Sequence, residues 1–408
     1  MLMPSKTILV INQYYRPDVA SSGQLLSELC EFLYSEGINV HVVTGQPSYT
    51  TDASPVLSDE MLNGVQIHRV RMGSSTGKTN LRIRCIGYFR FMSGAWYLSK
   101  KVSRINHPDA VITLSNPPIV GLIGRMISKK HKVPYIYVLY DIHPDILTTT
   151  NWIRLPNTVI KLWHLINSII FKSATKIIVP SHTMKNTLVH FKSLDEQKIT
   201  VIPNWARPEI KVSDVSYTIR SKFNIPQDHI LILYAGNIGI MQQLDPIIDT
   251  AYNLLGKPIH FLFLGEGENK SDLIEKANKL QLSNITFLSY QPERDFAQIV
   301  KESDACIVSL QARLDSYSAP SRAYTFLSAG TPLITLMSEK SELAGLVKDN
   351  SCGWNATNTD QLTNLLQNLL NTPEEYSIRG QNAEKLYQTR FAQKIIMNQY
   401  LNEIANEL

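Results

Sequence analysis

Short runs of aliphatic and β-branched residues alternate with longer helical stretches, and this alternation limits the possible folds more than any other feature of the chain. In the first half the runs are ILVIN at 8–12, VHVVT at 40–44, DAVITLS at 109–115, YIYVLY at 135–140, KIIVP at 176–180 and ITVIP at 199–203. Runs without polar alternation are typical of strands buried on both faces. With helices between them they predict a parallel, doubly wound α/β sheet.

The same alternation starts again after a segment with no clear period. Residues 205–216 follow Pro203, contain Pro208, and are interpreted as a linker. The second set of runs is HILILYAGN at 229–237, HFLFLG at 260–265, ITFLS at 285–289, ACIVSL at 305–310 and PLITL at 332–336, and the chain from Asp360 onward has a helical pattern. We predict Rossmann-like domains at 1–204 and 217–385 and a C-terminal helix within 386–408. Ligands bind at the carboxyl ends of such strands, so a cleft between the two domains is expected.

Composition excludes several classes of protein. Of the 408 residues, 44% are hydrophobic and 18% are charged, which is typical of a globular protein. The sequence contains no apolar stretch of the ~20 residues that span a bilayer, and its N-terminus does not read as a secretion signal. Four widely spaced cysteines, Cys30, Cys85, Cys306 and Cys352, fit reduced thiols better than disulfides or a zinc site. We therefore expect a cytoplasmic protein.

Positive charge is concentrated in the first half of the chain. Residues 1–204 carry 22 Lys/Arg and 12 Asp/Glu, whereas residues 205–408 carry 18 and 23. Residues 61–108 hold nine basic residues, no acidic residue and five aromatic residues. Basic side chains bind anionic lipid and aromatic side chains sit at headgroup depth. We expect docking on the inner face of the plasma membrane through a basic and aromatic set made up of Arg82, Arg84, Arg90, Trp96, Lys100 and Lys101.

Two other interpretations of this basic segment were weighed. A solvated helix face over a few buried aromatic residues would have the same composition. Single-stranded nucleic acid also suits basic residues interleaved with aromatic ones. The sequence has no recognised nucleic-acid module, so we expect no nucleic-acid partner.

Glycines follow the ends of predicted strands in both domains. Gly23 is placed in the loop after the first strand, Gly236 and Gly239 lie in AGNIG, and Gly265 and Gly267 lie in GEG. Glycine lets a backbone approach a phosphate or a sugar closely, although loop glycines are often simple turn residues. Neither GxGxxG nor a P-loop occurs, so dinucleotide or ATP binding lacks its motif.

The segment SAPSRAYTFLSAGTPLI at 318–334 is the strongest local signal. It predicts a helix that begins near Pro320 and ends at Gly330. Ser321 and Arg322 would then lie at the helix N-terminus, where N–H groups, the helix dipole and a guanidinium together bind an anion. A solvated arginine on an ordinary helix is the alternative.

The ordered set of motifs resembles one large enzyme family, the retaining GT-B glycosyltransferases called group 1 or family four. It is most similar to the branch that builds bacterial O-antigen, capsule and exopolysaccharide and includes the L-fucosamine transferases. The segments that carry the resemblance are INQYYRPDVASSGQLLSELCEFLYSEGINVHVVT, SNPPIVGLIG, YDIHPD, VIPNW, YAGNIGIMQQL, FLGEGE, ITFL, SDACIVSL and PSRAYTFLSAGTPLI.

The resemblance implies a division of labour between the domains. The first domain would bind a lipid-linked or polysaccharide acceptor, the second a nucleotide sugar, and the terminal helix would cross back to the first domain. Arg322 with Ser321 would hold the donor pyrophosphate, backbone near Tyr290 would border the base, and the Gly23 loop would approach the phosphate. The full donor-binding set is Gly23, Gly236, Asn237, Gly239, Gln242, Gly265, Gly267, Tyr290, Pro320, Ser321, Arg322, Tyr324 and Thr325.

Two departures from the family pattern affect the donor site. Many members have two glutamates eight residues apart, where this chain has Tyr317 and Thr325. Many also have an arginine and a lysine five residues apart, where this chain has Asn237 and Gln242. Arg322 is therefore expected to be the main cationic phosphate ligand.

The expected chemistry needs neither a metal nor a cofactor. No DxD motif occurs, so a metal-bridged pyrophosphate is not expected, and negative charge on the leaving phosphate would be stabilised by cations and N–H dipoles. The resemblance implies that YDIHPD, with His143 and Asp141, lies near the transferred sugar and acceptor. A purely structural histidine is the alternative for His143, and capping of the next turn is the alternative for Asp141. A nucleotide-sugar 2-epimerase and a non-catalytic sugar-nucleotide sensor are the competing functions.

Overall fold

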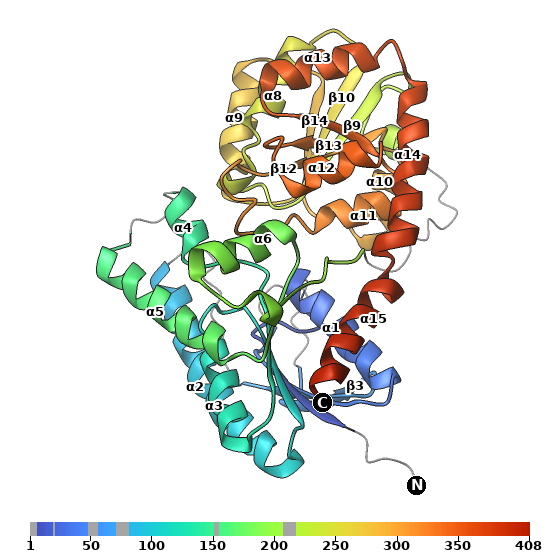
Figure 1. Cartoon of the computed structure of the whole chain (residues 1–408). Helices are drawn as coiled ribbons and strands as arrows, with labels where there is room; N and C mark the ends of the chain where they lie inside the picture. Colours follow the sequence, from blue (N-terminus) through green and yellow to red (C-terminus); the bar gives the residue numbers. More distant parts are fainter. Residues whose placement is uncertain (1–5, 19–20, 48–55, 71–80, 151–154, 207–217) are drawn as a thin grey trace. The chain divides into compact units, whose positions relative to one another are not determined.

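The structure is a computed structural model that describes residues 6–18, 21–47, 56–70, 81–150, 155–206 and 218–408 (Figure 1). Side chains of Ser21 and residues 81–85 are outside this description. The chain divides into two compact units. Unit 1 comprises Met1–Pro203 and Met397–Leu408, and unit 2 comprises Asn204–Ile396. Each unit contains one sheet of mainly parallel strands, as the aliphatic runs predict.

The sheet of unit 1 has eight strands in the order β3-β4-β2-β1-β5-β6-β7-β8. All neighbouring pairs are parallel except the antiparallel pair β3–β4. The strands are β1 (Thr7–Ile11), β2 (Asn39–Thr44), β3 (Asp59–Leu62), β4 (Val65–Arg69), β5 (Ala110–Leu114), β6 (Tyr135–Val138), β7 (Lys176–Val179) and β8 (Ile199–Val201). The central strands are buried on both faces because helices cover both sides of the sheet.

Helices α2 and α3 pack against each other, and α3 packs against α5. Figure 1 shows these three on one side of the unit 1 sheet and α1 on the other. The helical elements described are α1 (Ser21–Ser35), α2 (Leu81–Asn106), α3 (Gly121–His131), α4 (Asp145–Thr150), α5 (Asn157–Ser173), α6 (His182–Asn186), η1 (Thr187–Phe191) and η2 (Glu196–Lys198).

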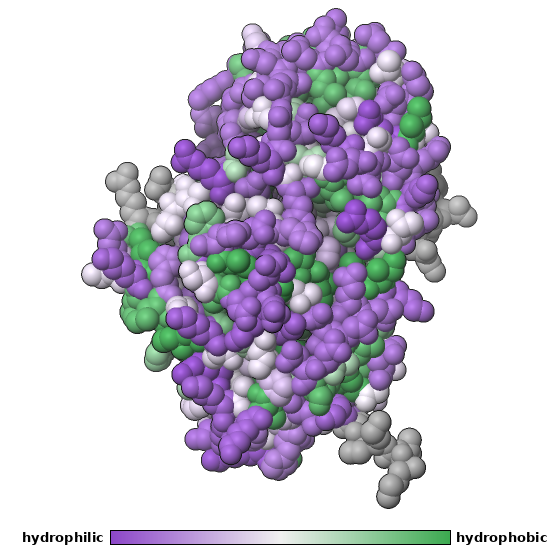
Figure 2. Space-filling view, viewed as in Figure 1, coloured by the Kyte–Doolittle hydropathy of each residue, from purple (hydrophilic) through white to green (hydrophobic). Residues whose placement is uncertain are grey.

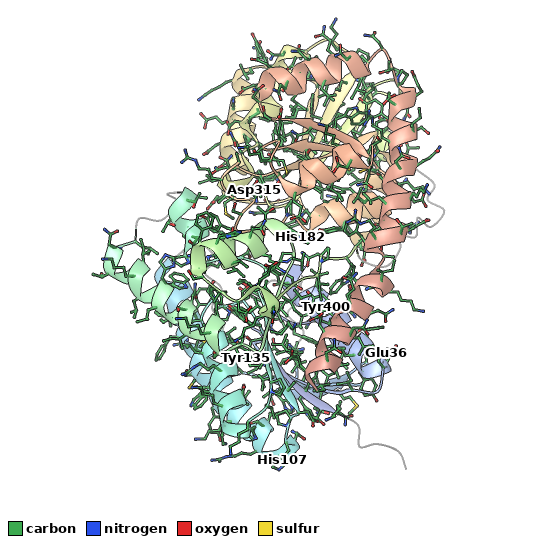
Figure 3. All side chains as sticks on the ribbon, in the orientation of Figure 1. Glu36, His107, Tyr135, His182, Asp315 and Tyr400 are labelled. Carbon is green, nitrogen blue, oxygen red and sulfur yellow. The ribbon has the colours of Figure 1, made fainter. Side chains whose placement is uncertain are left out.

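The end of α15 (Gln393–Glu407) completes unit 1. Glu403 accepts a hydrogen bond of 3.0 Å from the Thr200 hydroxyl and pairs with Lys176 at 3.3 Å. Tyr400, labelled in Figure 3, is buried, and its hydroxyl lies beside that of Tyr140. The last helix is thereby anchored to the β7–β8 end of the first sheet.

The sheet of unit 2 has six parallel strands in the order β11-β10-β9-β12-β13-β14. This is the strand order of a Rossmann sheet, and its direction reverses between β9 and β12. The strands are β9 (Ile230–Ala235), β10 (Ile259–Leu264), β11 (Ile285–Leu288), β12 (Ala305–Ser309), β13 (Leu333–Leu336) and β14 (Gly353–Ala356).

A continuous apolar core joins the unit 2 sheet to its helices. Phe261 and Phe263 of β10 and Leu362 and Leu366 of α13 are among its fully buried members. The remaining elements are α7 (Ile219–Lys222), η3 (Ile240–Gln242), α8 (Asp245–Asn253), α9 (Lys270–Lys279), α10 (Glu293–Glu302), α11 (Arg322–Ser328), α12 (Glu342–Asp349), α13 (Thr359–Leu369), α14 (Glu374–Leu386) and η4 (Tyr387–Phe391).

Three features differ from the sequence predictions. The β3–β4 hairpin and β14 were not predicted, and Gly23 lies in the first turn of α1 and not in a loop. Most of the predicted linker, from residue 207 onward, lies outside the described residues, whereas Trp205 and Ala206 are buried. In the part of the chain that the structure describes, no helix is both long enough and apolar enough to cross a bilayer.

Candidate donor and acceptor sites

The reversal of strand order in unit 2 brings the loops after β9 and β12 together. Such a switch point is where open α/β sheets bind ligands. The Ser309 hydroxyl at the end of β12 donates to the carbonyl of Gln242. The Gln311 amide and side chain donate to the carbonyls of Met241 and Ile240, each at 3.0 Å. Helix η3, which directly follows AGNIG, is thereby fixed to the end of β12 and the residues after it.

The AGNIG and GEG loops also interlock. The Gly236 amide donates to Leu264 at 2.8 Å, and the Ile238 amide donates to Glu266 at 2.9 Å. A Cβ on Gly265, whose φ is +149°, would lie 1.8 Å from the Gly236 carbonyl oxygen, and one on Gly267 would lie 2.2 Å from that of Ile238. These two glycines are therefore required by the close approach of one loop to the other.

Arg322 lies directly against the AGNIG loop. A Cβ on Gly236 would be 3.2 Å from both Cζ and Nε of Arg322 and 3.2 Å from the Tyr234 hydroxyl. That hydroxyl donates to the Asn237 carbonyl at 2.7 Å. Burial raises the pKa of Tyr234, the nearby Arg322 charge opposes this rise, and Tyr290 adds to it. The predicted residues Gly236, Asn237 and Arg322 are thus neighbours at the switch point.

The remaining donor predictions are distributed around this centre. A Cβ on Gly239 would be 2.7 Å from Asn237 Nδ2 and 2.9 Å from Gln242 Oε1, so both amide side chains crowd the loop. Gln242 Oε1 is buried with no hydrogen-bond partner among the residues that the structure describes. Tyr290 follows β11 and is 60% exposed.

The start of α11 holds the other predicted donor residues. Ser321 is its N-cap residue, without a side-chain capping bond, and Pro320 precedes it. The Thr325 carbonyl accepts from the Ser328 hydroxyl at 2.8 Å. Tyr324 is buried against Phe391 of η4, with ring centroids 4.9 Å apart. Within this helix, the structure brings Arg322 to the loop cluster and packs Tyr324 into the unit.

A cavity of about 460 Å³ adjoins the switch point, and no sequence motif indicated it. It opens beside the carboxyl ends of β12, β13 and β14. Its lining includes Gln243, Leu310, Met337, Lys340 and Thr357. The cavity therefore lies beside the predicted donor residues and is not lined by them.

In unit 1, His143 packs against two residues of α5. Its ring stacks on Trp163 at 6.0 Å between centroids, and Asn167 donates to its carbonyl. Its Nδ1 is buried with no hydrogen-bond partner in the described part of the chain. Burial lowers the pKa of His143, against the opposing effect of Asp141 and Asp145, so the ring is neutral near pH 7.

The acidic neighbours of His143 differ in their roles. Asp145 pairs with Lys192 at 2.7 Å, and its second oxygen lies 3.9 Å from His164. Asp145 thus anchors the start of α4. Asp141 is half-buried, and its negative charge acts to raise the pKa of His143.

A second polar group in unit 1 was not predicted. Asn12 and Gln13 follow β1 where the strand order reverses between β1 and β5. Both are buried, and Asn12 Oδ1 and Gln13 Oε1 have no partner among the described residues. The backbone N–H of Gln13 donates to the backbone carbonyl of Asn116, which follows β5, at 3.0 Å. Two amides directly after a buried strand are the signal that could have identified this site.

Gly23 lies against the residues that follow β1. A Cβ there would lie 2.9 Å from the Tyr14 Cβ and 3.1 Å from the Tyr14 carbonyl carbon. Glycine lets the first turn of α1 approach the chain after β1, and the Gly23 carbonyl accepts from Ser27 at 2.8 Å.

Both halves of the chain match glycosyltransferase families. Residues 22–205 match the glycosyl transferase 4-like domain, and residues 216–386 match the glycosyl transferases group 1 family. The chain belongs to the group 1 glycosyltransferases. Their GT-B fold accounts for the two parallel-sheet units.

Curated relatives of this group 1 glycosyltransferase are distant. A probable glycosyltransferase, WbjE of Pseudomonas aeruginosa, is 22% identical over 64% of the chain, and the match spans 65% of WbjE. WcaI of Escherichia coli strain K12, described as a putative colanic acid biosynthesis glycosyl transferase, is 22% identical over 83% of the chain and 85% of WcaI.

Solved structures share the fold over nearly the whole group 1 chain. Sucrose-phosphate synthase from Thermosynechococcus elongatus has a TM-score of 0.78 at 16% identity, with 98% of each chain covered. HepE from Anabaena, in complex with UDP-glucose, has a TM-score of 0.70 at 14% identity, with 98% of this chain and 99% of HepE covered.

The predicted membrane residues lie on α2. Arg90 and Lys101 are exposed, and Lys100 Nζ lies 6.0 Å from the centre of the Trp96 ring. The side chains of Arg82 and Arg84 lie outside the described part of this helix. No group of three metal-ligating side chains occurs among the described residues.

Proposed function

We propose that the chain is a retaining glycosyltransferase that uses a nucleoside diphosphate sugar, with a UDP-sugar favoured. The observation that carries this proposal is the Arg322 guanidinium beside Gly236 at the switch point of unit 2. A guanidinium beside a glycine-containing loop at the end of a strand is an arrangement that suits a diphosphate. The UDP-glucose in HepE, which has the same fold, supports this choice of donor.

In the proposed reaction the bond from the sugar to the diphosphate breaks while the acceptor oxygen attacks the same carbon. Negative charge grows on the leaving β-phosphate, and the positive charge of Arg322 stabilises it. The leaving oxygen takes the acceptor proton, so the step needs no side-chain nucleophile, metal or cofactor.

Unit 1 is proposed to bind the acceptor. Neutral His143 offers a buried ring nitrogen, and Asn12 and Gln13 offer buried amide oxygens without described partners. A buried polar atom without a partner is costly, and a sugar hydroxyl would satisfy it. We propose a lipid-linked or polysaccharide acceptor of cell-surface glycan biosynthesis, a process that the printed description of WcaI supports. A lipid-linked acceptor would bring the enzyme to the inner face of the plasma membrane.

The test is binding of nucleoside diphosphates to an Arg322→Ala variant. Loss of the cation should weaken UDP binding by about 2–4 kcal/mol, while uridine binding should barely change. Arg313→Ala, which removes an exposed arginine of the same unit, is the matched control. Calorimetry that gives Arg322→Ala the wild-type UDP affinity would refute the donor site.

The same preparation separates an enzyme from a sugar-nucleotide sensor. A transferase should release UDP slowly from its UDP-sugar by hydrolysis, and faster with acceptor present. An epimerase would convert the UDP-sugar without releasing UDP. A sensor would do neither.

A further inference from the structure

Helix α5 carries a row of exposed apolar side chains. Val159, Leu162, Leu165 and Ile169 are 42%, 57%, 58% and 38% exposed. They are three or four residues apart and so lie on one face of the helix. Figure 2 shows apolar surface gathered at the side of unit 1 where Figure 1 places α5.

The two neighbouring helices extend this apolar surface. Helix α3 packs against both α5 and α2. His107, labelled in Figure 3, lies just beyond α2. Its ring centroid is 6.5 Å from that of His131 of α3. On α2, Phe89 is 75% exposed and Tyr97 is 67% exposed. The other exposed apolar residues of the two helices are Ile86, Ile105 and Met126.

The charge of these three helices is of one sign. Their sequences contain no aspartate or glutamate. Their basic residues are Arg82, Arg84, Arg90, Lys100, Lys101, Arg104, Arg125, Lys129, Lys130, Lys161 and Lys172. The pKa of Lys130 is lowered by desolvation and then by the charges of Arg104 and Lys100, so cations of α2 and α3 crowd one another.

We propose that the face formed by α2, α3 and α5 is the membrane-binding surface, and that the apolar row of α5 enters the headgroup region of an anionic bilayer. Basic residues around apolar side chains suit anionic lipid. A second copy of the chain would present the same positive face and be repelled. This inference deepens the proposed function, because it rests on a lipid-linked acceptor and names the surface that reaches it.

The test is flotation with vesicles of phosphatidylethanolamine and phosphatidylglycerol, compared with phosphatidylcholine vesicles. Wild-type protein should float with the anionic vesicles only. A Leu162→Ser and Leu165→Ser double variant should partition at least tenfold less and lose the fraction that resists ~1 M salt, where charges are screened within ~3 Å. Changing Arg90 and Lys101 to Ser, which leaves nine other basic residues on the three helices, should reduce the salt-sensitive fraction.

Matched controls separate lipid contact from misfolding. Tyr252→Ser and Ile378→Ser remove side chains that are 52% and 51% exposed on unit 2, and should float like wild type. Leu162→Phe keeps the row apolar and should retain binding. Wild-type binding by the leucine double variant, or no binding of wild type to anionic vesicles, overturns the proposal.

Two further readouts keep the explanations apart. UDP affinity of the leucine double variant should equal that of wild type. If wild-type protein floats with anionic vesicles but does not bind UDP, the donor site is refuted and the membrane proposal stands. If wild type is a dimer that the leucine double variant converts to monomers without changed flotation, the face joins two copies of the chain and the membrane proposal fails.

Discussion

At the scale of the residue, the buried Nδ1 of His143 is the sharpest indication of where an acceptor hydroxyl could bind. The stacking on Trp163 and the hydrogen bond from Asn167 to the His143 carbonyl together restrict the orientation of the His143 ring. Because burial keeps the ring neutral, the nitrogen can accept a hydrogen bond near pH 7.

We therefore expect His143→Ala to lower kcat by about tenfold or more with UDP affinity kept. His143→Asn, whose amide can occupy the position of Nδ1, should recover part of the rate. His107→Ala, an exposed histidine of the same unit, should have no effect. Normal turnover by His143→Ala would leave this histidine a structural role only.

His260 on β10 predicts a pH-dependent stability of unit 2. It is 5% exposed, its Nε2 lies 2.8 Å from the Thr286 hydroxyl, and burial, then His229 and Arg220, lower its pKa to about 4. Above pH 6.5 both folded and unfolded states are neutral. Between pH 6.5 and 4 only the unfolded state gains a proton, so stability falls as the pH falls.

The expected loss at pH 4 is at most about 3 kcal/mol. It can be measured as the free energy of opening from hydrogen exchange of β9, β10 and β11 amides between pH 7 and 4.5. His260→Gln should flatten this dependence. An equally steep dependence in the variant would assign the effect to other groups.

At the scale of the element, the contact between the AGNIG and GEG loops fixes the candidate donor site. Gly265→Ala would place a methyl group 1.8 Å from the Gly236 carbonyl oxygen at a φ of +149°. We expect a loss of several kcal/mol of stability or a displaced AGNIG loop, with weaker UDP binding. Gly345→Ala, in α12 with no atom within 4 Å of the new Cβ, should instead stabilise by about 0.5–1 kcal/mol. Thermal unfolding with and without UDP distinguishes the two variants.

The parallel strands could be predicted because burial on both faces leaves an uninterrupted aliphatic run. The β3–β4 hairpin was missed although Asn63-Gly64, with φ values of 49° and 84°, forms its turn. Its strands alternate in burial and have no aliphatic run. Arg69, counted in the basic segment, is 2% exposed and bonded to Glu60 at 2.6 Å.

The contacts in the candidate site between segments that lie far apart in the sequence could not be predicted. The motif order indicated Arg322 and the AGNIG loop, but the approach of Arg322 to Gly236 depends on where α11 packs. The stacking of His143 on Trp163 joins the turn before α4 to helix α5. The apolar row of α5 lies outside residues 61–108, the segment that the sequence singled out by its positive charge. The row could not be predicted because the exposure of a side chain depends on tertiary packing.

At the scale of the whole molecule, group 1 membership with cationic rather than acidic donor residues predicts catalysis without a divalent ion. Transfer from a UDP-sugar should survive EDTA with its rate unchanged within about twofold. The measurement is UDP release with acceptor, before and after chelation, with added magnesium as the control. If chelation abolished turnover and magnesium restored it, the proposed role of Arg322 would be wrong.

The membership of Met397–Leu408 in unit 1 has a consequence for biosynthesis. Unit 2 is inserted into unit 1, so a ribosome that has finished Pro203 must still translate roughly 190 residues before the helix that anchors β7 and β8 emerges. At ~5–20 residues per second this takes about 10–40 s. During that interval the nascent first domain lacks Tyr400 and Glu403. Its β7–β8 end would then depend on chaperones for protection, and stop codons after residue 396 would impair the amino-terminal domain.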